Sequence, residues 1–283
     1  MKSRRHFLKA ASLSLAGTGM LPLVSSASSR PDETRNKPAT MLEMGVAGYT
    51  FHQFDIDQSI AMMQRVGVKM LSLKEFHLPL DSTKEKADEV VGKFKAAGIT
   101  VYTVGVIYMK TQASVDQTFT YARNVGVDMI IGVPNYELLK YAEQKVKETG
   151  IRLAIHNHGP EDKLYPGPKD VYDNIKNMDK GMGICLDIGH GIRAGADPAK
   201  SVESFKDRLY DLHIKDVTVA AKEGKAIELG RGVINFSALV AALRKVNYKG
   251  KCSIEFEKDM KDPLPGIAES VGFFRGIMHS STA

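Results

Sequence analysis

Four apolar segments in the second half of the chain end in residue types that bind metals or transfer protons. Residues 151–155 are apolar apart from one arginine and lead directly into His156, Asn157 and His158. Three later segments, GMGICLDIGH, LYDLHIKD and KCSIEFE, have the same form. Short apolar runs with polar boundaries indicate buried strands. Four such endings in succession predict a shared rim at one edge of a sheet.

The residue types at these endings are suited to a divalent metal ion. Asp187, His213 and Glu255 come from the three later segments and form a mixed oxygen and nitrogen set. Such a set favours Mn, Co, Zn or Mg. His156 stands at the end of the first segment and completes the predicted set of ligands. Glu161, five residues farther on, is the alternative, because the loop could turn back and supply a carboxylate.

The elements that position these residues alternate regularly along the chain. Strands are predicted at 43–48, 69–73, 99–106, 127–133, 151–155, 183–186, 209–214 and 252–256, and amphipathic helices lie between them. Ser82 and Ser114 are predicted to cap two of the helices. Eight near-continuous apolar strands alternating with helices favour an α/β fold, a (β/α)8 TIM barrel. A doubly wound open sheet is the alternative, but no GxGxxG motif follows the first strand. In a TIM barrel, the strand endings form the active-site face.

The N-terminal residues have the composition of an export signal. Arg4 and Arg5 form a twin-arginine signature, which an apolar stretch and small residues at 25–27 follow. We therefore expect a signal peptide over 1–27, a flexible lead-in over 28–40 and a single catalytic domain over 41–283. The predicted location is the periplasm.

Charge and hydropathy exclude two classes of partner. The 283 residues have a formal net charge of +6. The predicted leader holds four basic residues and no acidic one, so its removal leaves 6 − 4 = +2. That charge does not favour nucleic-acid binding. No apolar run outside the N-terminus is long enough to span a membrane, so no stable membrane insertion is expected after signal removal. Cys185 and Cys252 are predicted to be buried free thiols.

The motifs LAIHNH, CLDIGH, DLHIKD, ELGRGVINF and CSIEFE resemble the sugar phosphate isomerase/epimerase family of xylose isomerase-like TIM barrels. The resemblance covers nearly all of the chain after the leader. It implies that Asp187, His213 and Glu255 bind the metal and that His190 contacts substrate. Many members carry a metal-binding glutamate where this chain has His156, which puts a symmetric exchange between two glutamates in doubt. Members of the family often associate, so a homo-oligomer is compatible with the resemblance.

This resemblance implies chemistry beside a carbonyl group. A divalent ion that holds adjacent hydroxyl and carbonyl oxygens stabilises an enediolate, and a base then removes the neighbouring proton. The predicted catalytic residues are His158, His190, Glu161 and Lys215. Reprotonation gives an isomerase or epimerase, whereas loss of a β-leaving group or addition of water gives a 3-keto-glycoside lyase or an enol hydratase. A non-catalytic sugar-binding barrel is a further alternative.

The predicted substrate is a small carbohydrate. An exported enzyme should rarely meet sugar phosphates, and Gly230-Arg231-Gly232 is the only modest candidate for a phosphate site. We therefore expect an unphosphorylated sugar or keto-sugar. The residues predicted to bind it are His52, Glu75, His77, Asn157 and Arg231. An abasic-site endonuclease, which uses the same barrel, is excluded because no histidine follows in the loop after Asp216.

Overall fold

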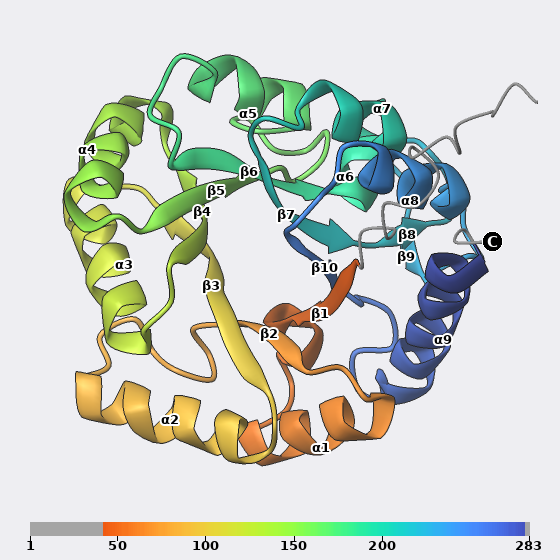
Figure 1. The fold of residues 1–283 in the computed structure, drawn as a ribbon, viewed down its shortest axis with the longest axis horizontal. Coiled ribbons are helices and arrows are strands. Elements are labelled where there is room, and N and C mark those ends of the chain that lie inside the picture. Colours follow the sequence, from red (N-terminus) through yellow and green to blue (C-terminus); the bar gives the residue numbers. More distant parts are fainter. Residues whose placement is uncertain (1–41, 281–283) are drawn as a thin grey trace, which may run out of the picture. The chain divides into compact units, whose positions relative to one another are not determined.

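The barrel is closed and parallel. The computed structural model describes residues 42–280, and the predicted signal peptide and lead-in lie outside these residues. Eight strands pair in the order β1-β10-β7-β6-β5-β4-β3-β2 (Figure 1). Because β1 pairs in parallel with both β2 and β10, the sheet has no free edge. The predicted TIM barrel is confirmed, and the open sheet is excluded.

Each barrel strand lies within two or three residues of its predicted position. The strands are β1 (Glu43–Ala47), β2 (Met70–Leu73), β3 (Thr100–Met109), β4 (Met129–Pro134), β5 (Arg152–His156), β6 (Met182–Asp187), β7 (Leu209–Ile214) and β10 (Lys251–Ile254). Their side chains are largely buried, and every residue of β4 and β6 is buried. Strands of a parallel sheet covered by helices are buried on both faces, which explains why they are apolar along most of their length.

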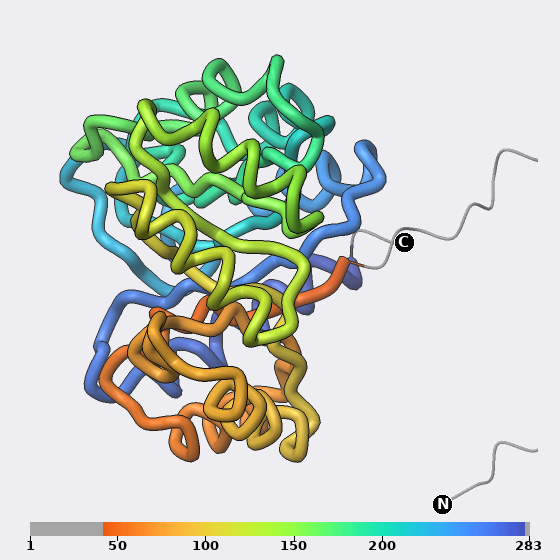
Figure 2. Tube along the Cα trace, turned by 90° about the vertical axis from the view of Figure 1, so that its left-hand side faces the viewer, coloured from red at the N-terminus to blue at the C-terminus, as the bar shows by residue number. Residues whose placement is uncertain are grey.

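Helices surround the barrel. They are α1 (Ile56–Val66), α2 (Lys84–Ala96), α3 (Gln112–Val125), α4 (Leu139–Thr149), α5 (Pro168–Ile175), α6 (Ile188–Arg193), α7 (Pro198–Ser204), α8 (Phe236–Lys245) and α9 (Leu264–Ser280). In Figure 2 the orange segments, from β1 to β2, lie on one side of the barrel, and the green segments that hold β5 and α5 lie on the opposite side. None of the helices between residues 42 and 280 combines the length and apolarity needed to cross a bilayer.

The helix ends follow capping rules, with two corrections to the predicted N-caps. Thr83 caps α2 through the amide of Lys86, one residue after the predicted Ser82. Thr111 caps α3 through the amide of Ser114, so Ser114 lies inside the helix. In both cases the threonine has the extended backbone conformation that an N-cap needs.

The segment between β7 and α8 forms a small hairpin. The two-residue strands β8 (Asp216–Val217) and β9 (Ala226–Ile227) pair in antiparallel fashion. The Asp216 carboxylate accepts hydrogen bonds from the backbone amides of Val217, Gly230, Gly232 and Ile234. The Asp216 side chain is buried, and its hydrogen bonds hold the segment between β7 and α8 against the end of the barrel. Elsewhere, Cys185 and Cys252 are buried free cysteines, as predicted.

Candidate active site

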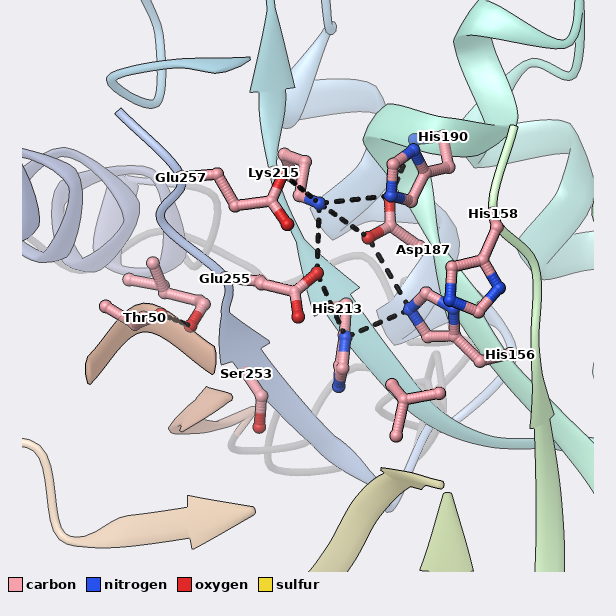
Figure 3. Close-up of polar contacts among 12 residues, drawn as sticks. Thr50, His156, His158, Asp187, His190, His213, Lys215, Ser253, Glu255 and Glu257 are labelled. Carbon is pink, nitrogen blue, oxygen red and sulfur yellow. Dashed lines mark hydrogen bonds and ion pairs between the residues drawn. The ribbon is translucent and has the colours of Figure 1, made fainter. Parts of the chain in front are cut away.

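The predicted rim forms at the ends of four neighbouring strands. His156 ends β5, Asp187 ends β6, His213 lies in β7, and Glu255 follows β10 directly. Asp187 and His213 are register partners, and His213 is also the partner of Ser253 on β10. Side chains two residues apart on an extended strand share a face, so Glu255 lies on the same side as Ser253. Figure 3 shows the four side chains converging.

Their ligand atoms lie close together. All four residues offer atoms that lie within 4.8 Å of one another. His156 Nε2 is 3.1 Å from His213 Nδ1 and 3.7 Å from Asp187 Oδ2, and His213 Nδ1 is 3.4 Å from Glu255 Oε2. All four side chains are buried, and Asp187 Oδ2 has no hydrogen-bond partner. Two nitrogens and two carboxylate groups around one point fit a borderline divalent ion.

A buried lysine lies beside this cluster. Lys215 Nζ is 2.9 Å from Glu255 Oε2, 2.9 Å from Glu257 Oε2 and 3.4 Å from Asp187 Oδ2. Burial lowers the pKa of Lys215, but the three carboxylates outweigh burial and hold that pKa well above its ordinary value. Lys215 is therefore a fixed positive charge at neutral pH. It can stabilise negative charge on a substrate oxygen, but it cannot act as a base.

The same lysine helps to keep the two carboxylates of the cluster ionised. Burial raises the pKa of Asp187 and of Glu255, but Lys215 and the neighbouring histidines together outweigh burial and hold both pKa values below their ordinary range. Burial also lowers the pKa of His213, but the Glu255 carboxylate outweighs it, and the net shift is upward. Since metals bind carboxylates in the ionised form, the charge state of Asp187 and Glu255 suits a metal site.

His158 lies at the outer side of the cluster. Its ring centroid is 4.4 Å from that of His156, and its Nε2 is 2.9 Å from the Tyr108 hydroxyl. Burial, followed by the influence of His156, lowers the pKa of His158 to about 3. The imidazole is therefore neutral at pH 7, and its orientation is set by Tyr108. A neutral imidazole in this position can accept a proton from a bound substrate.

His190 lies on α6 and contacts two cationic side chains. Its Nε2 is 3.3 Å from Lys215 Nζ, and its Nδ1 is 3.2 Å from Arg193 Nη1. Burial and then the Lys215 charge lower the pKa of His190 to about 4. Arg193 also pairs with Glu161, whose side chain is 45% exposed. The structure thus brings His156 rather than Glu161 into the ligand cluster, and Glu161 reaches the site only through Arg193.

The five residues predicted to bind substrate have different surroundings. Asn157 accepts a hydrogen bond from the backbone amide of Asp187 and donates one to its carbonyl, so it positions a ligand. His77 Nε2 is 2.9 Å from the carbonyl of Phe54 and 3.2 Å from the Ser59 hydroxyl, which are interactions within the fold.

The other three lie farther out. Arg231 pairs with Glu269 at the surface. His52 stacks on Tyr49, and Glu75 accepts a hydrogen bond from Lys74. His52 and Glu75 each keep one buried polar atom without a hydrogen-bond partner.

Two residues at the predicted strand ends had not been assigned a role in the site. Glu257 pairs with Lys215, and burial raises the pKa of its carboxyl group. Its position two residues after Glu255 was the available signal, because extended residues two apart share a face. The contact of Tyr108 with His158 was not predicted, because it joins the end of β3 to the segment after β5.

Comparison with known proteins agrees with this architecture. The family described as xylose isomerase-like TIM barrel matches residues 60–277. The chain belongs to this family. An inosose dehydratase from Histophilus somni is 28% identical over 155 residues, which cover 48% of this chain and 48% of that protein. The matched part of the present chain thus spans about half the length of the curated relatives it matches.

Solved structures also resemble this xylose isomerase-like barrel. A protein of unassigned function from Parabacteroides distasonis is 26% identical, has a TM-score of 0.65, and covers 83% of this chain and 98% of its own. The 3-keto-D-glucoside 4-epimerase from E. coli is 17% identical, with a TM-score of 0.68, over 83% of this chain and 100% of its own. At 17% identity, the second likeness shows the fold alone.

Proposed function

We propose that this protein is a divalent-metal-dependent isomerase or epimerase that acts next to the carbonyl of an unphosphorylated sugar or keto-sugar. The observation that carries the proposal is the buried cluster of His156, Asp187, His213 and Glu255 beside the fixed charge of Lys215. A divalent ion held by these four residues would supply Lewis-acid stabilisation for the oxygens of an enediolate. Mn, Co, Zn and Mg are the candidate ions.

The proton is carried by the histidines outside the ligand cluster. His158 is the proposed base, and its hydrogen bond with Tyr108 fixes the ring before substrate binds. His190 is the proposed partner, and its ring is a neighbour of His158, with centroids 5.9 Å apart. Lys215 lies beside His190 and favours negative charge on the substrate oxygen as the proton leaves. Glu161 supports His190 through Arg193.

The nature of the substrate follows from the surroundings of the cluster. Arg231, in the glycine-containing segment Gly230-Arg231-Gly232, pairs with Glu269. This supports a neutral carbohydrate over a sugar phosphate. Export by the twin-arginine route to the periplasm, where sugar phosphates are scarce, remains part of the proposal; residues 1–27 lie outside the described part of the chain.

Elimination is the second candidate. The same proton removal followed by loss of a β-leaving group makes the enzyme a 3-keto-glycoside lyase, and addition of water in the reverse sense makes it an enol hydratase. The inosose dehydratase relative favours this reading, because its name denotes loss of water, although it matches only about half of this chain. His156 at the end of β5 also favours it, since a symmetric exchange between two glutamates requires a carboxylate there.

The test is an NMR time course in deuterated buffer. The metal-loaded protein is mixed with a panel of ketoses and 3-keto-glycosides, with chelator-treated protein as the control. Deuterium entering the carbon next to the carbonyl, with no group lost, is the expected result. Loss of the aglycone or uptake of water would move the assignment to the lyase or hydratase. Metal binding without proton exchange on any substrate would refute catalysis and leave a sugar-binding barrel.

A further inference from the structure

The most exposed large apolar side chains gather at one end of the barrel. Each lies at the C-terminal end of a barrel strand or in the segment that follows it, which is the end that carries the candidate active site. Among residues 42–280 they are Tyr49, Phe76, Tyr108, Tyr136, Val219 and Val233. Scattered exposed apolar residues need no explanation, but a concentration of them beside a candidate site indicates a binding surface.

Three of the rings at this end form a continuous surface, which we call the aromatic platform: Tyr49, His52 and Phe76. Tyr49 and His52 are stacked, with centroids 5.2 Å apart and planes 14° apart. His52 meets Phe76 edge to face, with centroids 6.4 Å apart. The platform forms because β1 and β2 are neighbours: Tyr49 and His52 follow the end of β1, and Phe76 follows the end of β2. Tyr49 is 39% exposed and Phe76 is 41% exposed, so their ring faces are available to a ligand.

Polar atoms without partners lie next to these rings. His52 Nδ1 and Glu75 Oε2 are buried and make no hydrogen bond, while the other oxygen of Glu75 accepts from Lys74. Both atoms are buried, but the Glu75 side chain as a whole is 39% exposed and places a carboxylate next to Phe76 in the chain. A ring with an apolar face and hydroxyl groups at its edge suits a surface that combines exposed rings with a carboxylate. A pyranose ring has this form.

Tyr108 connects the aromatic platform with the candidate active site. Its hydroxyl is 2.9 Å from His158 Nε2, and the two rings stack with centroids 5.3 Å apart. Tyr108 is 50% exposed near the end of β3, and β3 pairs with β2, the strand that Phe76 follows. A ligand larger than one sugar ring could contact both regions.

We infer that the aromatic platform binds a second pyranose ring, joined by a glycosidic bond to the keto-sugar that reacts at the ligand cluster. The substrate class is therefore a keto-disaccharide rather than a free monosaccharide. This inference rests on the proposed function, because the platform matters for turnover only if the reacting sugar is held at the cluster. The second ring contributes binding and takes no part in proton transfer.

The first test compares rates on matched substrates. Methyl 3-keto-glucoside is compared with 3-keto derivatives of cellobiose, maltose and trehalose. We expect kcat/KM to be about tenfold higher for at least one disaccharide, which corresponds to about 1.4 kcal/mol. Phe76→Ala and Phe76→Leu should remove that advantage through KM and leave the methyl glycoside unaffected. Tyr141→Ala, at a partly buried tyrosine of α4 that contacts Asp116 and Lys145, is the matched control and should retain the preference. Equal kcat/KM values for all substrates would overturn the inference.

The second test is independent of turnover. Unoxidised cellobiose, maltose and trehalose lack the reactive carbonyl, so their binding is measured by saturation-transfer NMR against methyl glucoside. Stronger binding of a disaccharide that Phe76→Ala abolishes supports the platform even if no proton exchange is ever detected, in which case only the proposed function fails. Equal binding of all four sugars overturns the platform. Sedimentation is run in parallel: a dimer that Phe76→Ala dissociates would assign the rings to a second copy of the chain and also overturn it.

Discussion

At the residue scale, His156 sets the charge of the ligand cluster. When both imidazoles are neutral, Asp187 and Glu255 give the cluster a formal charge of −1 − 1 = −2, which one divalent ion balances. A glutamate in place of His156 would add a third negative charge to a buried site. The neighbouring Lys215 already compensates carboxylates in the absence of metal. A histidine at this position therefore suits a site in which a lysine and a metal ion share the same two carboxylates.

The assignment of the fourth ligand is directly testable. We expect His156→Ala to weaken Mn²⁺ affinity by at least about 100-fold, since loss of an outer-shell partner alone commonly has an effect of 10- to 100-fold. Competition with a fluorescent chelator measures this affinity. Glu161→Ala is the matched control and should bind Mn²⁺ as the native protein does, because Glu161 pairs with Arg193. The reverse pattern would assign the ligand to Glu161.

Asp211 gives a prediction about pH. This carboxyl group lies inside the barrel, where Tyr102 donates a hydrogen bond of 2.8 Å to it. Burial raises its pKa from 3.8 to about 7. The folded state therefore holds the proton more tightly than the unfolded state. Its contribution to stability is complete below about pH 4 and is lost as pH rises towards 7.

We expect Asp211→Asn to be stabilised relative to the native protein as pH increases. The difference in unfolding free energy should change by about 1.4 kcal/mol per pH unit between pH 4 and pH 7 and then level off. Urea unfolding of chelator-treated protein across this range measures it. Asp262→Asn, at an exposed position, controls for the loss of a charge. Parallel pH profiles for native protein and Asp211→Asn would refute the shift.

At the element scale, one side chain organises the segment between β7 and α8. Asp216 accepts hydrogen bonds from four backbone amides, at 2.9 Å from Val217, Gly230 and Gly232 and at 3.2 Å from Ile234. A Cβ atom at Gly232 would collide with the Asp216 carboxylate and the Val217 carbonyl, so only glycine fits this approach. The segment lies at the mouth of the barrel, and its order depends on this carboxylate.

We expect Asp216→Ala to destabilise the fold by at least about 3 kcal/mol, because hydrogen bonds to charged groups contribute about 1.5–3 kcal/mol each. The amides of Gly230, Gly232 and Ile234 should lose hydrogen-exchange protection first. Urea unfolding and exchange measured by mass spectrometry report the two effects. Asp216→Asn retains one acceptor oxygen and should lose less. Native-like protection in Asp216→Ala would show that the segment is held by other contacts.

At the scale of the whole molecule, the ligand cluster links four strands that are far apart in the chain. His156 and Glu255 are separated by about a hundred residues and meet only because the barrel closes. A metal ion bound by all four residues would connect β5, β6, β7 and β10. Because such a site is absent in the unfolded chain, binding free energy becomes folding free energy.

Metal binding should therefore raise the melting temperature. An ion at 100 times its dissociation constant adds about 2.7 kcal/mol, and for a chain of this size that corresponds to about 5–10 °C. Differential scanning calorimetry with Mn²⁺ and with chelator measures the shift. His156→Ala should show little or none of it. A shift that persists undiminished in His156→Ala would place the ion elsewhere on the protein.

The barrel follows from local patterns in the sequence. Apolar runs of strand length, helices ended by glycine, and regular alternation specify each unit separately, and Gly67, Gly126 and Gly150 are helix C-caps with positive φ. Strand β7 begins and ends at its predicted residues. The helix α6 was missed because its six residues include two glycines. It forms because the Asp187 carboxylate accepts a hydrogen bond from the amide of His190.

Residue types at the strand ends were enough to predict which side chains could bind a metal. Their surroundings were decided by tertiary structure. His156 was the predicted ligand and Glu161 the alternative; the end of β5 places His156 in the cluster, and the loop that follows brings Glu161 to Arg193. The pairing of Lys215 with three carboxylates could not be predicted either, because these residues come from β6, the end of β7 and the end of β10. Contacts between distant segments depend on register and barrel closure, and no local pattern encodes these distances.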